Sequence, residues 1–368
     1  MKFEPGAMGV TEGLGLVFMT TGTRIFLTTP SESINSMASA AWASPLIAGF
    51  AALVSFWLLS YAQQKTGGDL IRTAGLLLGK PAAFVIGLFY LAAFFVDAIW
   101  LLRQFAENTL ITALPYANYY IIVGWYGLCT GIMVYLGIEA MGRAAYIVMP
   151  ISILALVFLL LLLIPFYDYH FLAPWLGNGL GLTLKNSFSL TGLDLGVLLL
   201  IIFAPSFQTA RTRNQAALLV LVLGNILRAL SIACFIMAFG VAMGAERTLP
   251  FYEMSRLVYL SRYVQRIEAL FILLWVIIGL LAIAIDLYIT LYLFARLAKL
   301  NTIRPLIVPT VLISIQLASL PRSVSTVLLL DKYSQSLFNV GLLVIPPLLF
   351  LAALLKRKDP SKCSCRES

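Results

Sequence analysis

Two short stretches of hydroxyl, glycine and proline residues interrupt apolar segments that are otherwise typical of membrane helices. The first, Thr20-Thr21-Gly22-Thr23, lies within the segment Val10–Thr29. The second, Phe203-Ala204-Pro205-Ser206, lies within Leu193–Phe207. In lipid, an unpaired backbone amide or carbonyl costs several kcal/mol unless it lines a cavity or meets a ligand. We therefore expect a polar ligand at the interruptions, and these eight residues are the candidate substrate-binding residues.

Each interruption has a second interpretation. Unwound backbone near Gly22 would direct N–H groups and the favourable end of a helix dipole towards a carboxylate. Small residues and threonines also form close packing faces between membrane helices. Pro205 removes a backbone N–H, but a simple proline kink is tolerated in a membrane helix. The two interruptions lie at corresponding positions in the two halves of the chain. Paired interruptions of this kind form the binding sites of transporters, so they favour a binding site here.

Several charged residues lie within or beside the apolar segments, where each is costly and is by default a functional hypothesis. Asp97 and Asp286 are candidate proton carriers. Arg24 and Arg228 are candidates for charge coupling or for neutralising these carboxylates. Arg24 could pair with Asp97 or attract an acidic ligand. Arg228 could form an ion pair with Asp286 or with Asp194.

The composition predicts an all-α integral membrane protein. Of the 368 residues, 61% are hydrophobic and 11% are charged, whereas soluble domains carry roughly 25% charged residues. A membrane helix needs roughly 20 apolar residues, and this rule predicts ten segments. They are Val10–Thr29, Ala41–Ala62, Ala82–Leu110, Tyr119–Leu136, Ala144–Pro165, Leu193–Phe207, Ala216–Ala242, Ile267–Ala295, Leu306–Leu320 and Leu337–Leu355.

The order of the segments predicts one membrane domain, residues 1–355, built from two halves at about 10–165 and 184–355. Five segments in each half place the halves in opposite orientations, as an inverted repeat requires. The net charge of +9 follows from the positive-inside rule, so we expect a lipid bilayer and no nucleic acid as the partner. The charge bias predicts cytoplasmic termini and a basic cytoplasmic tail, 356–368, in which the role of Cys363 and Cys365 is open.

Signatures of enzymes are absent from the sequence. The single histidine, His170, falls in a loop between segments, and there is no phosphate-binding loop, metal-ligand spacing or intramembrane-protease motif. We expect no enzymatic activity, metal or cofactor. The stretch Ile278–Ala284 has no hydroxyl residue, which disfavours a sodium site and leaves Asp97 or Asp286 for any proton coupling.

Four motifs in order resemble one family over nearly the whole chain. They are Thr20-Thr21-Gly22-Thr23-Arg24-Ile25 with Pro30 and Ala41-Trp42, Gly137-Ile138-Glu139 through Arg143, Arg266-Ile267-Glu268 through Phe271 and Trp275, and Asp331-Lys332-Tyr333 through Asn339 with Pro346-Pro347. The chain resembles the B subunits of spore-germination nutrient receptors, a branch of the amino acid–polyamine–organocation superfamily.

The resemblance implies a leucine-transporter-type fold of five plus five helices, with the first and sixth helices broken around a pocket for a small nutrient. It also implies a place in the spore inner membrane, with an A-type subunit and a C-type lipoprotein as partners. Within the motifs, Glu139 with Arg143 and Arg266 with Glu268 are candidates for a gate or a partner contact. Each pair is also explained as an ion pair at a helix end.

Two functions follow from these observations. The first is a membrane subunit that binds a nutrient such as an amino acid at the helix breaks and signals germination. The alternative is a secondary transporter that couples amino acid uptake to protons.

Overall fold

The computed structural model describes residues 8–27, 29–207, 209–247, 249–258, 268–321 and 324–356, and these form helices, turns and one isolated β-bridge. The α-helices are α1 (Val10–Gly22), α2 (Thr29–Met37), α3 (Ser44–Thr66), α4 (Leu70–Leu78), α5 (Lys80–Thr112), α6 (Tyr119–Leu136), α7 (Ile138–Leu162), α8 (Leu180–Ser189), α9 (Leu199–Ile202), α10 (Ala210–Glu246), α11 (Pro250–Leu257), α12 (Glu268–Ala298), α13 (Arg304–Ala318), α14 (Val324–Asn339) and α15 (Ile345–Leu355). Short 3-10 segments include η1 (Thr23–Phe26), η2 (Ala38–Ala43), η5 (Thr191–Leu198) and η6 (Ala204–Ser206), and a π-helical turn, η7 (Val340–Val344), joins α14 to α15.

Every expected apolar segment contains helix. Eight helical stretches of the described residues are long and apolar enough to cross a membrane. The remaining two expected segments are α1 with η1 and the shorter helix α13. The largest differences in bounds are in the sixth segment, where helix begins at Leu180 rather than Leu193, and in the tenth, where α14 begins at Val324 rather than Leu337.

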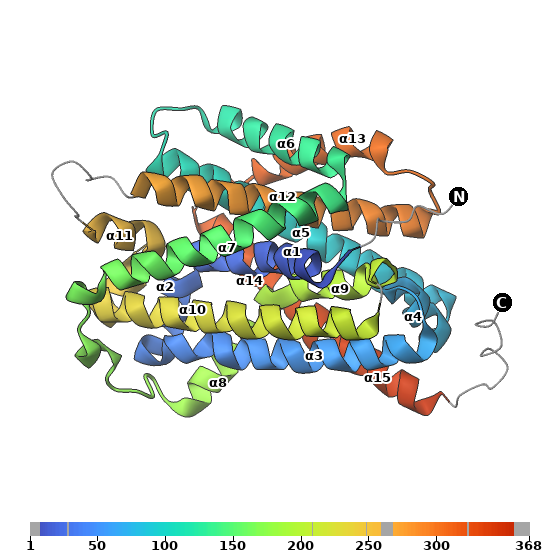
Figure 1. Ribbon diagram of the computed structural model, residues 1–368, viewed down its shortest axis with the longest axis horizontal. Helices are drawn as coiled ribbons and strands as arrows, with labels where there is room; N and C mark the ends of the chain where they lie inside the picture. The colour runs from blue at the N-terminus through green and yellow to red at the C-terminus, as the bar shows by residue number, and fades with distance from the viewer. Residues whose placement is uncertain are drawn as a thin grey trace.

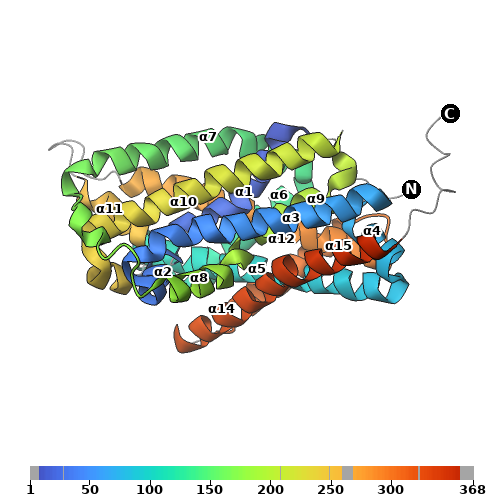
Figure 2. The ribbon, with the colours of Figure 1, turned by 90° about the horizontal axis from the view of Figure 1, so that it is seen from below.

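The long helices run side by side along the longest axis of the molecule (Figure 1). α6 and α13 lie together along one edge, and α3 and α10 lie together along the opposite edge. α1, α5 and α12 lie between these edges, and α12 packs most extensively against α5. α14 and α15 cross the outside of the bundle obliquely (Figure 2).

Glycine allows a close contact between two helices of this bundle. A Cβ atom built on Gly279 of α12 would lie 2.2 Å from the Phe105 ring of α5. That ring is fully buried, and its centroid lies 5.1 Å from the centroid of the Trp275 ring. Small residues let membrane helices approach closely enough for dispersion forces to hold them together, and Gly279 serves this purpose between α5 and α12.

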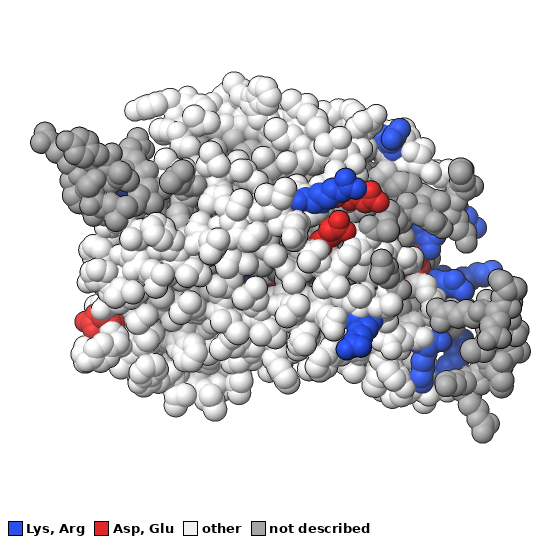
Figure 3. Space-filling view, in the orientation of Figure 1, with Lys and Arg blue, Asp and Glu red and all other residues white. Residues whose placement is uncertain are grey.

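Most lysine and arginine residues on the face shown in Figure 3 lie at one end of the bundle, where α4, α9 and α15 end or begin. At this basic end, an ion pair joins Asp69 and Arg296, and Arg213 donates to Gln63 Oε1 over 2.5 Å. At the opposite end, Ser31 Oγ donates to the Arg247 carbonyl over 2.6 Å. Polar bonds therefore join the helices at both ends of the apolar bundle.

The close contact at Gly279 predicts that adding one methyl group there destabilises the protein. Gly279→Ala should lower the free energy of unfolding by about 1–3 kcal/mol, because the rigid, buried Phe105 ring has no room to move. Gly124→Ala on α6 is the control, since nothing lies within 4 Å of its added Cβ. Thermal unfolding of the two purified variants in detergent checks this, and equal midpoints would contradict it.

Candidate functional site

The first interruption lies one turn later than expected. α1 continues through Gly22, whose backbone is helical, and only then tightens into η1. Thr20 and Thr21 donate their hydroxyls to the Val17 carbonyl over 3.0 and 2.9 Å, and Thr23 donates to the Thr20 carbonyl. The three hydroxyls bond within their own helix because side chains of threonine reach carbonyls three or four residues back. The prediction of unwound backbone at Gly22 is therefore wrong.

The second interruption also lies elsewhere. Between the α-helices α8 and α9, the chain forms the 3-10 segment η5 near the middle of this span. The predicted break, Phe203-Ala204-Pro205-Ser206, instead lies at the end of the span, where Met8 N donates to the Ser206 carbonyl over 2.9 Å. Pro205 lies in the first turn of η6, where a missing N–H removes no hydrogen bond. Phe203 is fully buried beside Tyr292, with ring centroids 4.8 Å apart.

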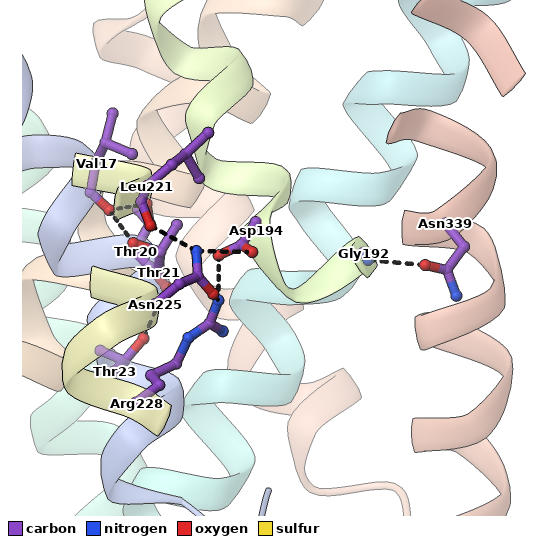
Figure 4. Close-up of polar contacts among 10 residues, drawn as sticks. All are labelled: Val17, Thr20, Thr21, Thr23, Gly192, Asp194, Leu221, Asn225, Arg228 and Asn339. Atoms are coloured by element: carbon purple, nitrogen blue, oxygen red, sulfur yellow. Dashed lines mark hydrogen bonds and ion pairs between the residues drawn. The ribbon is translucent and has the colours of Figure 1, made fainter. Parts of the chain in front are cut away.

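The two irregular spans touch at Gly196 of η5. A Cβ atom built there would lie 2.1 Å from Thr20 Oγ1 on α1, so only glycine fits at this crossing. Four residues earlier, Gly192 N donates to Asn339 Oδ1 of α14 over 2.7 Å (Figure 4). Gly192 thus brings the backbone of η5 against α14, and Gly196 brings it against α1. The predicted meeting of two irregular helices does occur.

Buried charges surround the crossing. Arg24 of η1 forms an ion pair with Asp97 of α5, one of the two alternatives that the sequence left open for Arg24. Asp286 of α12 is fully buried, and neither of its carboxylate oxygens has a hydrogen-bond partner among the described residues. Asp286 lies within electrostatic reach of both Asp97 and Arg24. The cluster thus holds two carboxylates and one guanidinium group.

A second ion pair continues this cluster. Arg228 of α10 donates from Nη2 to Asp194 Oδ1 of η5 over 2.5 Å, and not to Asp286. The same Nη2 donates to Asn225 Oδ1, and Asn225 Nδ2 contacts Asp194 Oδ2 at 3.4 Å (Figure 4). Both side chains of the ion pair are less than one-tenth exposed. The pair therefore fixes η5 against α10.

A small cavity lies beside the crossing. Both irregular spans line it, through Arg24 of η1 and Leu193 of η5, and α10 contributes Arg228 and Ser231. Ser33 of α2 lies in its wall as well. Of the predicted site residues, Arg24 and Arg228 meet in this cavity, whereas the eight residues at the expected breaks do not line it.

The predicted gate residues lie apart from the cavity. Glu139 and Arg143 form an exposed pair 3.8 Å apart in the first turns of α7. Glu268 begins α12 and is buried. Arg266 and the tail residues Cys363 and Cys365 lie outside the described residues. A gate or partner contact at these positions stays a prediction.

Sequence reasoning missed the residues that shape the crossing and the cavity. Gly192 and Gly196 lie four residues apart in an apolar segment with Asp194 between them, and glycines in membrane helices mark close helix contacts. This pattern was a usable signal. Ser33 and Ser231 had none, because single serines are common in membrane helices.

Comparison with solved structures identifies the architecture. Mhp1, a nucleobase-cation-symport-1 family transporter in a closed conformation with bromovinylhydantoin bound, superposes with a TM-score of 0.68 at 12% identity, covering 97% of this chain and 80% of Mhp1. MhsT in complex with L-phenylalanine superposes with a TM-score of 0.65 at 15% identity, covering 96% of this chain and 99% of MhsT. The predicted all-helical, leucine-transporter-type membrane fold is thereby confirmed, while the repeat boundaries stay a prediction.

Comparison at the level of sequence supplies the family. No curated protein matches the chain. Residues 13–327 match the family described as spore germination protein, which agrees with the resemblance seen in the four motifs. Because this match covers most of the chain, the protein belongs to the spore germination protein family of membrane permeases.

Proposed function

We propose that this protein is the membrane subunit of a germinant receptor, which binds a small nutrient such as an amino acid in the cavity beside the crossing. The observation that carries the proposal is the cavity lined by both irregular spans, through Arg24 and Leu193. A ligand that contacts both spans binds differently to two arrangements of them, and such a difference is what shifts a conformational equilibrium. Binding can thus become a signal.

The wider context of the proposal comes from the family. A-type and C-type receptor subunits are the expected partners, and the exposed Glu139–Arg143 pair of α7 is accessible to one of them. The bilayer is the spore inner membrane or the cell membrane. The basic end, which holds the first and last described residues, faces the cytoplasm by the positive-inside rule.

A second function, proton-coupled amino acid transport, is favoured by one observation. Asp286 is fully buried, with no hydrogen-bond partner among the described residues and one guanidinium group shared with Asp97. A buried charge without a partner is costly, and the group is neutralised by a proton instead. A carboxyl that carries a proton beside the crossing is a suitable coupling group for a transporter.

The crossing gives the first test of the receptor function. Gly196→Ala forces η5 away from Thr20 and should abolish the germination response, while membrane insertion is retained. Gly181→Ala on α8 is the control, because nothing lies within 4 Å of its added Cβ. In the double variant Thr20→Gly/Gly196→Ala, the threonine side chain that would overlap the new methyl group is gone, so the germination response should be restored. Normal germination with Gly196→Ala alone would overturn the role of the crossing.

The charge cluster gives the second test. Asp97→Asn leaves Arg24 without its ion-pair partner and should lower the free energy of unfolding by about 3–5 kcal/mol. Asp286→Asn replaces an unpartnered carboxyl with a neutral group of the same shape and should leave this free energy nearly unchanged. Denaturation of the purified variants measures both. Equal losses would show that Asp286 is a charged partner of Arg24 and not a proton carrier.

Transport itself separates the two functions. In proteoliposomes, a labelled amino acid panel should bind without accumulating if the protein is a receptor. Accumulation that follows a proton gradient and is lost in Asp286→Asn would establish the transporter instead.

A further inference from the structure

The cavity beside the crossing contains polar groups that the protein itself leaves unused. Ser33 on α2 and Ser231 on α10 line the cavity, and the buried hydroxyl of neither has a hydrogen-bond partner among the described residues. Each serine is only 1% exposed. Ser44, a third serine in the wall, instead donates to the Ala41 carbonyl over 2.8 Å. A buried hydroxyl without a partner is destabilising, so two of them in one cavity indicate a missing hydrogen-bonding ligand.

Arg228 adds further donors to the same wall. Within the described residues, both of its hydrogen bonds leave from Nη2, towards Asp194 and Asn225. The guanidinium group carries N–H donors on Nε and Nη1 as well. Asp194 balances the charge of Arg228 while these donors remain, so an acceptor in the cavity gains hydrogen bonds without displacing the ion pair.

The remaining lining limits the chemistry of the occupant. The wall contains two guanidinium groups, those of Arg24 and Arg228, and no carboxylate. Leu190, Leu193 and Ile232 supply apolar surface beside them. A lining that combines cationic donors with apolar side chains matches a small molecule with an anionic, acceptor-rich end and a hydrocarbon end.

We infer that this cavity binds a small carboxylate, with its oxygens on Arg228, Ser33 and Ser231 and its hydrocarbon part on Leu190, Leu193 and Ile232. The inference rests on the proposed function, because it names the ligand class for the same cavity. Two kinds of molecule carry such a carboxylate next to a hydrocarbon part, namely an amino acid and a free monocarboxylic acid.

The experiment uses the full chain purified in detergent and measures thermal unfolding against millimolar ligand. The probes are L-valine with its neutral amide L-valinamide, and isobutyrate with isobutyramide, with sodium chloride matching the ionic strength. We expect a carboxylate to raise the unfolding midpoint and its amide to have no effect. A response to L-valine alone identifies the amino acid as the source, and a response to isobutyrate alone identifies the free acid.

Serine variants locate the site. Ser33→Ala and Ser231→Ala should each lower the affinity for the carboxylate about tenfold, the usual effect of losing one hydrogen bond to a charged group. Neither should lower the midpoint without ligand, because the hydroxyls bond nothing in the empty protein. Ser314→Ala on α13 is the control for affinity, since this equally buried serine lies outside the cavity and donates to the Thr310 carbonyl.

Three results would overturn the inference. They are an equal response to the amides, no response to either carboxylate, and a serine variant that destabilises the ligand-free protein. A separate experiment tests the proposed function. Ala48→Leu fills the cavity, and a normal germination response in that variant would overturn nutrient binding there, whatever the ligand class.

Discussion

The contact between Gly196 and Thr20 is the constraint on which the middle of this structure depends. A Cβ atom at Gly196 has no room against Thr20, so the 3-10 segment η5 lies directly on α1. This contact brings Asp194 of η5 within electrostatic reach of Arg24. The charges of the core are therefore arranged around a point where two helices meet through a glycine.

Burial explains how these charges are distributed. An ion removed from water needs a partner with good geometry, and Arg24 with Asp97 and Arg228 with Asp194 meet this need. Asp286 shares the first pair without a hydrogen bond of its own among the described residues. The cluster around the crossing is thus one charge short of balance, and a proton or a change in the pairing of Arg24 restores it. The same cluster provides one wall of the cavity.

Neighbouring helices are held together by different forces at their ends and in their middles. At the ends, polar bonds such as those of Asp69 with Arg296 and of Ser31 with the Arg247 carbonyl join neighbouring elements. In the middle, close packing at glycines such as Gly279 holds α5 and α12 together. The bonds at the ends are directional hydrogen bonds and ion pairs, whereas the contacts at the glycines are close packing held by dispersion forces.

The sequence by itself determined the class of the protein. Apolar runs of membrane length predicted the helices, because lipid leaves the backbone no other way to satisfy its polar groups, and the family motifs predicted the fold. The sequence also identified Arg24, Asp97, Arg228 and Asp286 as important, since a charge in an apolar segment is conspicuous. Tertiary structure alone decided how these charges pair and where the helices become irregular. Thr20 to Thr23 and Phe203 to Ser206 looked like breaks, but threonine hydroxyls bond within a helix and proline fits a helix start. The cavity depended on Ser33, Ser231 and Arg228 meeting across α2 and α10, and contacts between residues so far apart in the chain leave no local pattern to detect.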